Sequence, residues 1–242
     1  MVIGARVKTQ LRNWFRSKKI RCPLGLVEDT VARHGAQAWF AYSFRDRRSR
    51  WEQWRTSNWL ANNLPATSTI LDSGCGIGSN LLWLGQNGFS QLLGFDLDER
   101  AIDCGKEIAK RLEIEPNLWC ADGLNPTGVV CNSVDAVLVM NWLMLVPKVD
   151  LSQFLTSYAS LLRTNGVLFL DVIDKSYDTI PNNEYLTSDW QKPAEDRQST
   201  EYKSRFSRSD VEAAVITSGF LVEHVWLERQ IVPRRVYRLR RT

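Results

Sequence analysis

The sequence contains few residues of the kinds that bind metals or form disulfide frameworks. It has 242 residues, only two histidines, and five scattered cysteines without a Cys-x-x-Cys pair. These counts argue against a zinc site, and we expect no metal. An odd number of cysteines in a chain of this length favours the reducing cytoplasm over a secreted disulfide framework. Long apolar runs are missing too, since none approaches the roughly 18 residues that a transmembrane helix needs.

Acidic residues are missing from the start of the chain. None occurs before Glu28, whereas seven lysines and arginines do. Apolar residues recur there at helical spacing, which predicts a basic amphipathic helix at the N-terminus. Such a helix is typical of nucleic-acid binding, of an anionic membrane surface or of a transit peptide. A solvated arm without a partner is the alternative.

Residues 69–80 are the stretch around which the rest of the chain is organised. A short apolar run predicts a buried strand, which leads into Gly74, Gly76 and Gly78. Glycines at such a turn allow a sharp bend and a close approach of a ligand, and the amides of the following helix face electron-rich groups. The dinucleotide fingerprint Gly-x-Gly-x-x-Gly would need a glycine at position 79, which is serine.

A second short strand ends on a carboxylate about twenty residues after the glycine turn. It comprises residues 91–95 and is followed by Asp96. An ionised carboxylate accepts hydrogen bonds from two adjacent hydroxyls, so an acid at this place suits a ribose diol. The glycine turn and Asp96 together predict a nucleoside-containing ligand.

Four motifs in order give the chain a resemblance to a known family. They are residues 72–78 (DSGCGIG), 94–98 (GFDLD), 120–123 (CADG) and 134–140 (VDAVLVM). In this order and at this spacing they resemble the class I S-adenosylmethionine-dependent methyltransferases. The resemblance covers roughly residues 52–173 and, more loosely, 207–241. It implies the cofactor S-adenosyl-L-methionine and a Rossmann-like fold, and it says little about the methyl acceptor.

The resemblance also implies which residues contact the cofactor. Asp96 would bind the ribose diol, and Asp122 would accept from the adenine amino group. Asp98 is as well explained by a helix N-cap. The full implied set is Asp72, Ser73, Gly74, Cys75, Gly76, Gly78, Asp96, Leu97, Asp98, Ala121, Asp122, Gly123, Met140 and Asn141.

Alternating apolar strands and amphipathic helices predict an α/β fold with a doubly wound, mostly parallel sheet. Strands are expected at residues 69–72, 91–95, 118–121, 135–140, 167–173, 220–228 and 236–240. Helices are expected at residues 28–41, 78–86 and 98–112, from Asp150 to the Asn165-Gly166 pair, and from a capping box of Ser209 and Glu212 to residue 218. The resemblance implies seven strands in the order 3-2-1-4-5-7-6, with strand 7 antiparallel and helices on both faces.

Two segments outside the motifs are candidates for the acceptor side. Residues 1–50 are predicted to form a basic and aromatic helical extension that acts as a lid, ahead of a cofactor-binding domain at 51–242. An irregular insertion at about 174–206 carries further aromatic residues, and segments of this length are functional or disordered. The substrate-binding candidates are Trp39, Tyr42, Trp142, Tyr177, Tyr185 and Trp190.

No residue stands out as a general base. The weak catalytic candidates are His34, Asn141, Asp171 and Asp174, whereas His224 falls in an expected edge strand and is interpreted as structural. The favoured function is a cytoplasmic methyltransferase acting on an oxygen or nitrogen of a small molecule, such as a sugar or natural-product intermediate. An RNA or protein methyltransferase is the alternative, because both ends of the chain are basic. A non-catalytic S-adenosylmethionine-binding protein is the second alternative.

Overall fold

The computed structural model describes residues 20–23, 25–45, 51–228 and 231–242. The expected basic helix at the N-terminus lies outside these residues, as does most of the arginine-rich stretch 45–50. Two compact units divide the chain, residues 1–123 and 124–242. The predicted domain boundary at residue 50 falls at an undescribed stretch and stays a prediction. In the described part of the chain, no helix combines the length and the apolar character needed to cross a membrane.

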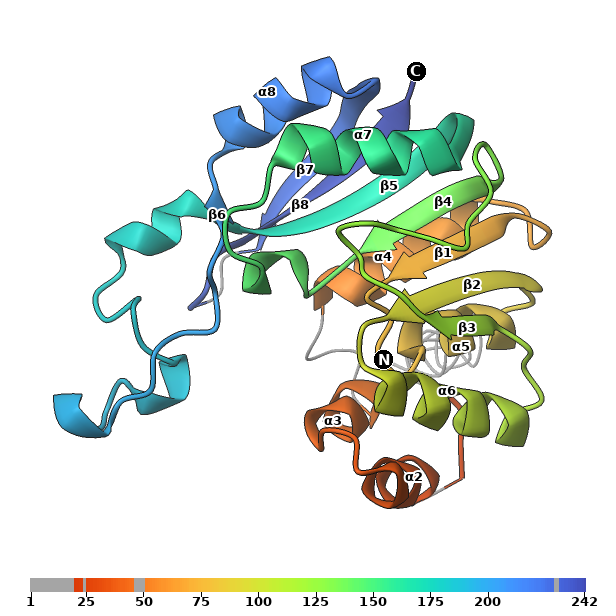
Figure 1. The fold of residues 1–242 in the computed structure, drawn as a ribbon, viewed down its shortest axis with the longest axis horizontal. Helices are drawn as coiled ribbons and strands as arrows, with labels where there is room; N and C mark the ends of the chain where they lie inside the picture. Colours follow the sequence, from red (N-terminus) through yellow and green to blue (C-terminus); the bar gives the residue numbers. More distant parts are fainter. Residues whose placement is uncertain (1–19, 24, 46–50, 229–230) are drawn as a thin grey trace, which may run out of the picture. The chain divides into compact units, whose positions relative to one another are not determined.

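Unit 1 contains three parallel strands with helices packed around them (Figure 1). Its strands follow the order β3-β2-β1, as predicted. They are β1 (Thr69–Ser73), β2 (Gln91–Asp96) and β3 (Asn117–Cys120). The helices are α2 (Leu26–His34), α3 (Trp39–Arg45), α4 (Trp51–Asn63), α5 (Ser79–Gln86) and α6 (Glu99–Arg111).

Helix α6 packs against the strands of unit 1 through an apolar stripe. Its buried residues are Ala101, Ile102, Cys104, Gly105, Ile108 and Ala109. Gly105 is required at the centre of this stripe, because a Cβ there would lie only 3.0 Å from the Ile77 carbonyl oxygen in the glycine turn. The small residue therefore lets α6 lie directly against the main chain that follows β1.

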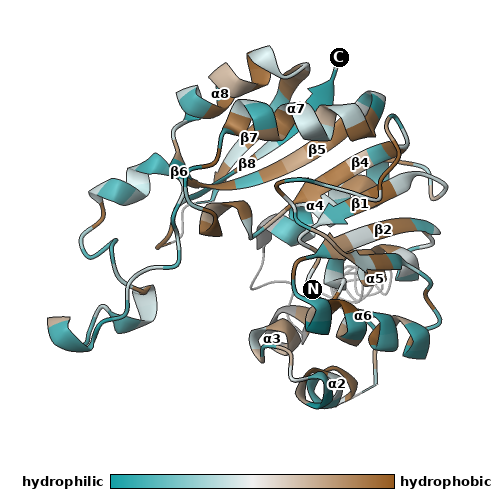
Figure 2. Ribbon diagram, viewed as in Figure 1, coloured by the Kyte–Doolittle hydropathy of each residue, from teal (hydrophilic) through white to brown (hydrophobic). Residues whose placement is uncertain are grey.

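Unit 2 contains the strand order β4-β5-β8-β7, in which β8 runs antiparallel to both neighbours. Apolar side chains dominate β4 and β5 (Figure 2), as expected for strands covered on both faces. The strands are β4 (Val134–Val139), β5 (Leu162–Asp174), β6 (Arg205–Phe206), β7 (Phe220–Glu228) and β8 (Arg234–Arg241). The helices are α7 (Leu151–Leu161), α8 (Arg208–Thr217) and the short 3-10 turn η2 (Leu143–Leu145).

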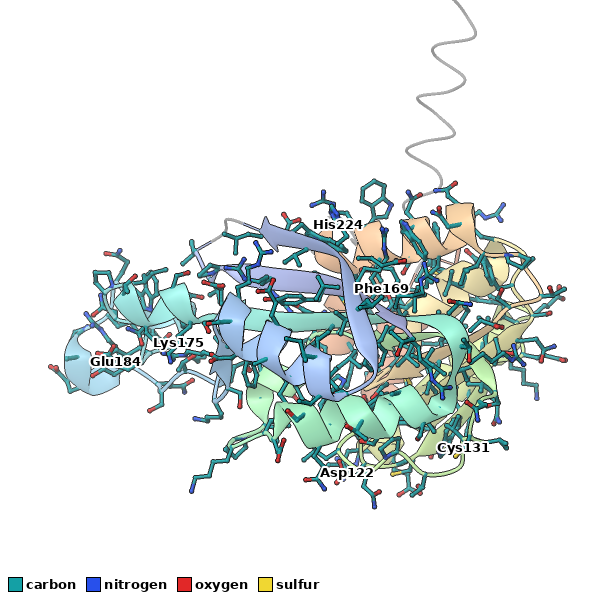
Figure 3. The ribbon with its side chains drawn as sticks, turned by 90° about the horizontal axis from the view of Figure 1, so that it is seen from above. Asp122, Cys131, Phe169, Lys175, Glu184 and His224 are labelled. Carbon is teal, nitrogen blue, oxygen red and sulfur yellow. The ribbon has the colours of Figure 1, made fainter. Side chains whose placement is uncertain are left out.

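The predicted α/β fold with mostly parallel strands is confirmed, and the two-residue strand β6 explains a shift in numbering. Strand β6 pairs with the end of β5. The strands predicted as sixth and seventh are therefore β7 and β8. Between β5 and β6 lies the predicted insertion, which holds three 3-10 turns, η3 (Lys175–Thr179), η4 (Thr187–Asp189) and η5 (Ala194–Asp196). Figure 3 labels Lys175 and Glu184 in this segment, which extends beyond the end of β5.

Three local predictions are wrong, and the first two concern where helices end. The helix expected at 28–41 is divided into α2 and α3 by Gly35, which adopts a φ angle of 62°. The helix from Asp150 ends at Leu161, because Leu162 is already extended and pairs with Val134 of β4. The Asn165-Gly166 pair lies inside β5 instead of ending the helix.

The third error concerns the start of α8. Ser207 and Asp210 form the capping box, in which Asp210 Oδ2 accepts from the Ser207 amide at 2.8 Å. The sequence holds two overlapping Ser-x-x-acid patterns, and the expected pair of Ser209 and Glu212 is the wrong one. Glu212 instead accepts from Arg208 Nε at 2.7 Å, one helical turn away.

Candidate cofactor site

The glycine turn between β1 and α5 is bent by residues in the left-handed backbone region. Gly74, Gly76 and Gly78 have φ angles of 69°, 55° and 75°, which glycine adopts without the penalty that a Cβ brings. Two main-chain hydrogen bonds of 2.9 Å fix the turn, from the Cys75 amide to the Phe95 carbonyl and from the Gly78 amide to the Cys75 carbonyl. The turn therefore presents main chain, not side chains, at the end of β1.

Asp96, the last residue of β2, binds the glycine turn through its carboxylate. Its Oδ2 accepts a hydrogen bond from the Gly76 amide at 2.7 Å, and its Oδ1 accepts one from the Asp98 amide at 3.0 Å. Burial raises the pKa of Asp96 above its usual value, while the backbone amides of Asp98 and Gly76 oppose that rise. A carboxylate has about four acceptor positions, so each oxygen keeps capacity for a ribose hydroxyl.

Leu97 and Asp98 connect β2 to α6 and have contrasting roles. The Leu97 side chain is 72% exposed, which leaves an apolar surface beside Asp96 that suits the face of a flat ring. Asp98 Oδ1 accepts from the amides of Arg100 at 3.0 Å and Ala101 at 3.3 Å. Asp98 is thus the N-cap of α6, the role that the sequence offered beside adenine contact.

The residues after β3 lie next to Asp96. The Ala121 amide donates to the Asp96 main-chain carbonyl at 3.1 Å, and Ala121 is buried. Asp122 is exposed and Gly123 partly so; Figure 3 labels Asp122. Because the carboxyl ends of parallel strands share one edge, the segments after β1, β2 and β3 meet at the rim where ligands of such sheets bind. Unit 1 therefore brings most of the implied cofactor residues together.

Asp72 belongs to a buried series of side-chain hydrogen bonds that the sequence did not predict. Its Oδ2 accepts from Asn80 Nδ2 at 3.0 Å, and Asn80 Oδ1 accepts from Ser57 Oγ of helix α4 at 3.5 Å. All three side chains are buried. Asn80 supports the Asp72 carboxylate from the first turn of α5, and the only signal for it is a polar residue just before an apolar Leu-Leu-Trp-Leu run.

In unit 2, Asn141 follows β4 in a left-handed conformation with a φ angle of 65°. Its amide donates to Asp171 Oδ2 at 3.2 Å, and Asp171 is fully buried. Arg234 binds both oxygens of Asp171, with Nε 3.1 Å from Oδ1 and Nη2 in contact with Oδ2. The Asn141 Nδ2 and Trp142 Nε1 atoms are buried without a partner among the described residues. Met140, the preceding residue, is buried.

Asp174 is paired in the same way as Asp171. Its Oδ2 accepts from Arg235 Nε at 2.7 Å and also contacts Arg235 Nη2. Burial acts to raise the pKa of Asp174, but hydrogen bonds from Ser176 and Arg235 outweigh it, and the pKa lies below the usual value. A carboxylate held ionised by a guanidinium is a poor proton acceptor.

The aromatic candidates of the insertion form a small core of their own. Tyr177 is fully buried against Met144 and Ile173, and Trp190 and Tyr202 pack on this cluster. The remaining candidate is Tyr185, whose main-chain carbonyl accepts from Trp190 Nε1 at 3.3 Å and whose ring lies 5.4 Å from the Arg197 guanidinium carbon. Substrate contacts of Tyr177, Tyr185 and Trp190 remain predictions.

The candidates from the lid region have mixed positions. His34 Nε2 lies 2.9 Å from Glu107 Oε2 on α6, which is a contact within unit 1. Trp39 is 48% exposed, and the Tyr42 side chain is outside the described part of the chain. His224 lies on β7 with its ring centroid 5.3 Å from that of Trp226 (Figure 3), in the strand where it was interpreted as structural.

The family model that matches the chain is described as a methyltransferase domain and covers residues 70–166. Magnesium protoporphyrin IX methyltransferase from Synechocystis PCC 6803, solved with S-adenosylhomocysteine, is 18% identical with a TM-score of 0.62, and the match covers 97% of this chain and 95% of that one. An S-adenosylmethionine-dependent methyltransferase from Mesorhizobium loti is 20% identical with a TM-score of 0.59, covering 78% and 98%.

A third similar structure is that of a C-methyltransferase. Geranyl diphosphate C-methyltransferase from Streptomyces coelicolor A3(2) is 14% identical with a TM-score of 0.56, and the match covers 78% of this chain and 79% of that one. No curated protein matches the sequence. At these sequence identities the solved structures are evidence for the fold alone. The family model is evidence for a methyltransferase domain at residues 70–166. Residues 70–166 therefore match a methyltransferase domain, and the fold agrees with the class I Rossmann-like fold of S-adenosylmethionine-dependent methyltransferases.

Proposed function

We propose that this methyltransferase acts on an oxygen or nitrogen of a small-molecule acceptor, such as a sugar or natural-product intermediate. The main observation behind the proposal is that arginines of the basic C-terminal strand form ion pairs within the protein. Arg234, Arg235, Arg238 and Arg240 of β8 each bind a carboxylate of unit 2. A nucleic-acid site needs an excess of positive charge that can pair with phosphates, and carboxylates of unit 2 already balance the charges of these four arginines.

The acceptors named for two similar structures agree with the small-molecule part of this proposal, although the second enzyme is a C-methyltransferase. Magnesium protoporphyrin IX and geranyl diphosphate are both small molecules. The sequence after β4 is Met-Asn-Trp-Leu, which lacks the Asn-Pro-Pro-Tyr type of motif that enzymes methylating nucleic-acid amino groups often carry. Both points favour a small acceptor over RNA.

We assign the cofactor to the rim of unit 1, whose residues fit its chemistry. Asp96 would accept from the ribose hydroxyls, Leu97 would cover the adenine, and the glycine turn would lie against the methionine part. When bound, the cofactor supplies a methyl group on a sulfonium, which already activates the leaving group. The protein then has chiefly to align the acceptor in line with the methyl and to exclude water.

None of the four weak catalytic candidates is assigned the role of a general base. Asp171 and Asp174 each hold an arginine, and His34 holds Glu107. Asn141 carries an amide, which does not take up protons. In this proposal, alignment contributes more to the rate than proton removal by these four side chains.

A metabolite screen tests the proposal. Purified protein is incubated with S-adenosylmethionine and a small-molecule extract, and the products are searched for a gain of about 14 Da, one CH2 per transfer. A labelled small molecule supports the proposal. Label in RNA or protein instead supports the alternative acceptor class, and bound cofactor without any transfer supports a non-catalytic binding protein.

A further inference from the structure

The N-terminal part of unit 1 is held on helices α5 and α6 at two separate points. The main chain of Arg21 exchanges two hydrogen bonds with the Gln86 side chain at the end of α5, at 2.8 and 2.6 Å. Farther on, Arg33 and His34 at the end of α2 bind Glu107 of α6. Helices α2 and α3 (Leu26–Arg45) are called the lid segment below; Figure 1 shows them beside α6.

The contacts around Glu107 form a compact cluster. Arg33 Nη1 donates to Glu107 Oε2 at 3.0 Å and Arg33 Nη2 donates to Oε1 at 2.7 Å, in the two-pronged geometry that strengthens such pairs. His34 Nε2 lies 2.9 Å from the same Oε2. A single exposed ion pair contributes little, but three contacts to one carboxylate fix the end of α2 on α6.

The segment after this cluster leads to the glycine turn, through a bend at Gly35 and a contact of Phe40. Gly35 turns the chain between α2 and α3 in a left-handed conformation. On α3, the Phe40 ring is buried and lies on the main chain of Gly76. A Cβ added at Gly76 would be 2.6 Å from Phe40 Cε1 and 3.1 Å from its Cδ1. The ring thus occupies the side of Gly76 where any other residue would have a side chain.

Gly76 is also the residue whose amide binds Asp96. The same short turn therefore contacts both an aromatic ring and the predicted ribose-binding carboxylate. The neighbouring Trp39 ring lies 3.9 Å from Phe40, centroid to centroid, but is about half exposed.

We propose that Phe40 is a cofactor-positioning residue and that the Glu107 cluster holds it in place. Phe40 forms an apolar wall over the glycine turn, where it keeps the main chain of Gly76 in position and excludes water from the bound cofactor. The inference rests on the proposed assignment of the glycine turn and Asp96 to the cofactor. It adds a residue outside the four motifs and a fastening point at Glu107 on α6.

Calorimetry with S-adenosylhomocysteine tests the role of Phe40. Phe40→Ala is expected to weaken binding at least tenfold, which corresponds to about 1.4 kcal/mol. Phe40→Leu keeps an apolar wall and should restore affinity to within about threefold. Ile216→Ala, at an exposed apolar residue of α8, is the control, with affinity expected within about twofold of wild type.

The measurements are made on protein shown by circular dichroism to be folded, well below each variant's melting temperature. A purely structural role would lower the melting temperature of Phe40→Ala and leave the affinity of the folded protein unchanged, which overturns the proposal. Tighter binding by Phe40→Ala also overturns it, because the ring would then obstruct the ligand. If wild type itself fails to bind, the assignment of the cofactor site is at fault instead.

The Glu107 cluster is tested by the rate of ligand release. Glu107→Gln removes the charge that holds Arg33 and His34, so the lid segment should open more often and S-adenosylhomocysteine should dissociate at least about threefold faster in stopped-flow experiments. Asp103→Asn is the control, since Asp103 forms an exposed pair with Lys106 on the same helix. Equal release rates for Glu107→Gln and wild type contradict a fastening role.

Discussion

The two units hold their acidic site residues in different ways. In unit 1, Asp96 and Asp98 accept hydrogen bonds from main-chain amides, most of them only two or three residues away. In unit 2, Asp171 and Asp174 bind guanidinium groups that are 63 and 61 residues farther along the chain. The first arrangement is made by a turn, and the second by the pairing of two strands.

This difference decides what a change to each site does. Main-chain amides remain in place when a side chain is replaced, so a change in unit 1 should chiefly affect the ligand. A guanidinium in unit 2 neutralises a carboxylate that is buried, so its removal leaves a charge without compensation. We therefore expect losses of binding from unit 1 and losses of stability from unit 2.

The largest effect is expected for Arg234→Ala. Asp171 is fully buried and would lose its ionic partner, and breaking a buried pair costs about 3–5 kcal/mol of unfolding free energy. Urea denaturation measures this loss. Arg240→Ala is the control, because Arg240 and Glu223 are each more than a quarter exposed and such a pair contributes up to about 1 kcal/mol. If both variants lost the same unfolding free energy, the buried pair would contribute no more to stability than the exposed one.

Asp96→Ala should give the largest loss of binding. Hydrogen bonds to a charged acceptor contribute about 1.5–3 kcal/mol each, so losing the ribose contacts should weaken S-adenosylhomocysteine binding roughly a hundredfold, about 2.7 kcal/mol. Calorimetry measures the change, with Asp103→Ala on α6 as the control. Unchanged affinity of Asp96→Ala would show that this carboxylate serves only the Gly76 and Asp98 amides.

The contrast between the units also explains what the sequence predicts well. The strands and helices around Asp96 could be placed because each signal is local: a glycine turn, a strand ending on an acid, and Asp98 as an N-cap. The strand order of each unit followed from the resemblance and is confirmed. Local signals failed where two of them overlapped, as in the choice between Ser207 and Ser209 for the cap of α8.

Contacts over long distances in the sequence could not be predicted. Asp171 and Asp174 were named as weak catalytic candidates, and their ion pairs with arginines were missed because nothing in the sequence gives the register that places Ile173 opposite Arg234. The contact of Phe40 with Gly76 depends in the same way on how α3 lies against the turn. Asn80 was missed because its partner Asp72 lies on a strand, across the glycine turn from α5.

Asp98→Ala tests whether Asp98 serves the helix or the ligand. As an N-cap it binds two amides of α6, and losing a cap costs about 0.5–2 kcal/mol of stability. The melting temperature should fall, while affinity for S-adenosylhomocysteine stays within about threefold. Asp98→Asn keeps the cap and should recover most of the stability. A tenfold loss of affinity in a folded Asp98→Ala protein would instead indicate contact with the adenine.

The smallest effect is expected at Glu107, where acid should reduce the difference in stability between wild type and Glu107→Gln. Hydrogen bonds from Arg33 and His34 lower the pKa of Glu107 from 4.5 to about 2. Because the folded-state pKa is depressed, the stabilisation is complete above pH 4.5 and is lost as the pH falls toward about 2. The difference in melting temperature between the two proteins should therefore be constant above that range and shrink within it. A difference that stays constant at acidic pH would mean that the charge of Glu107 does not fasten α2 to α6.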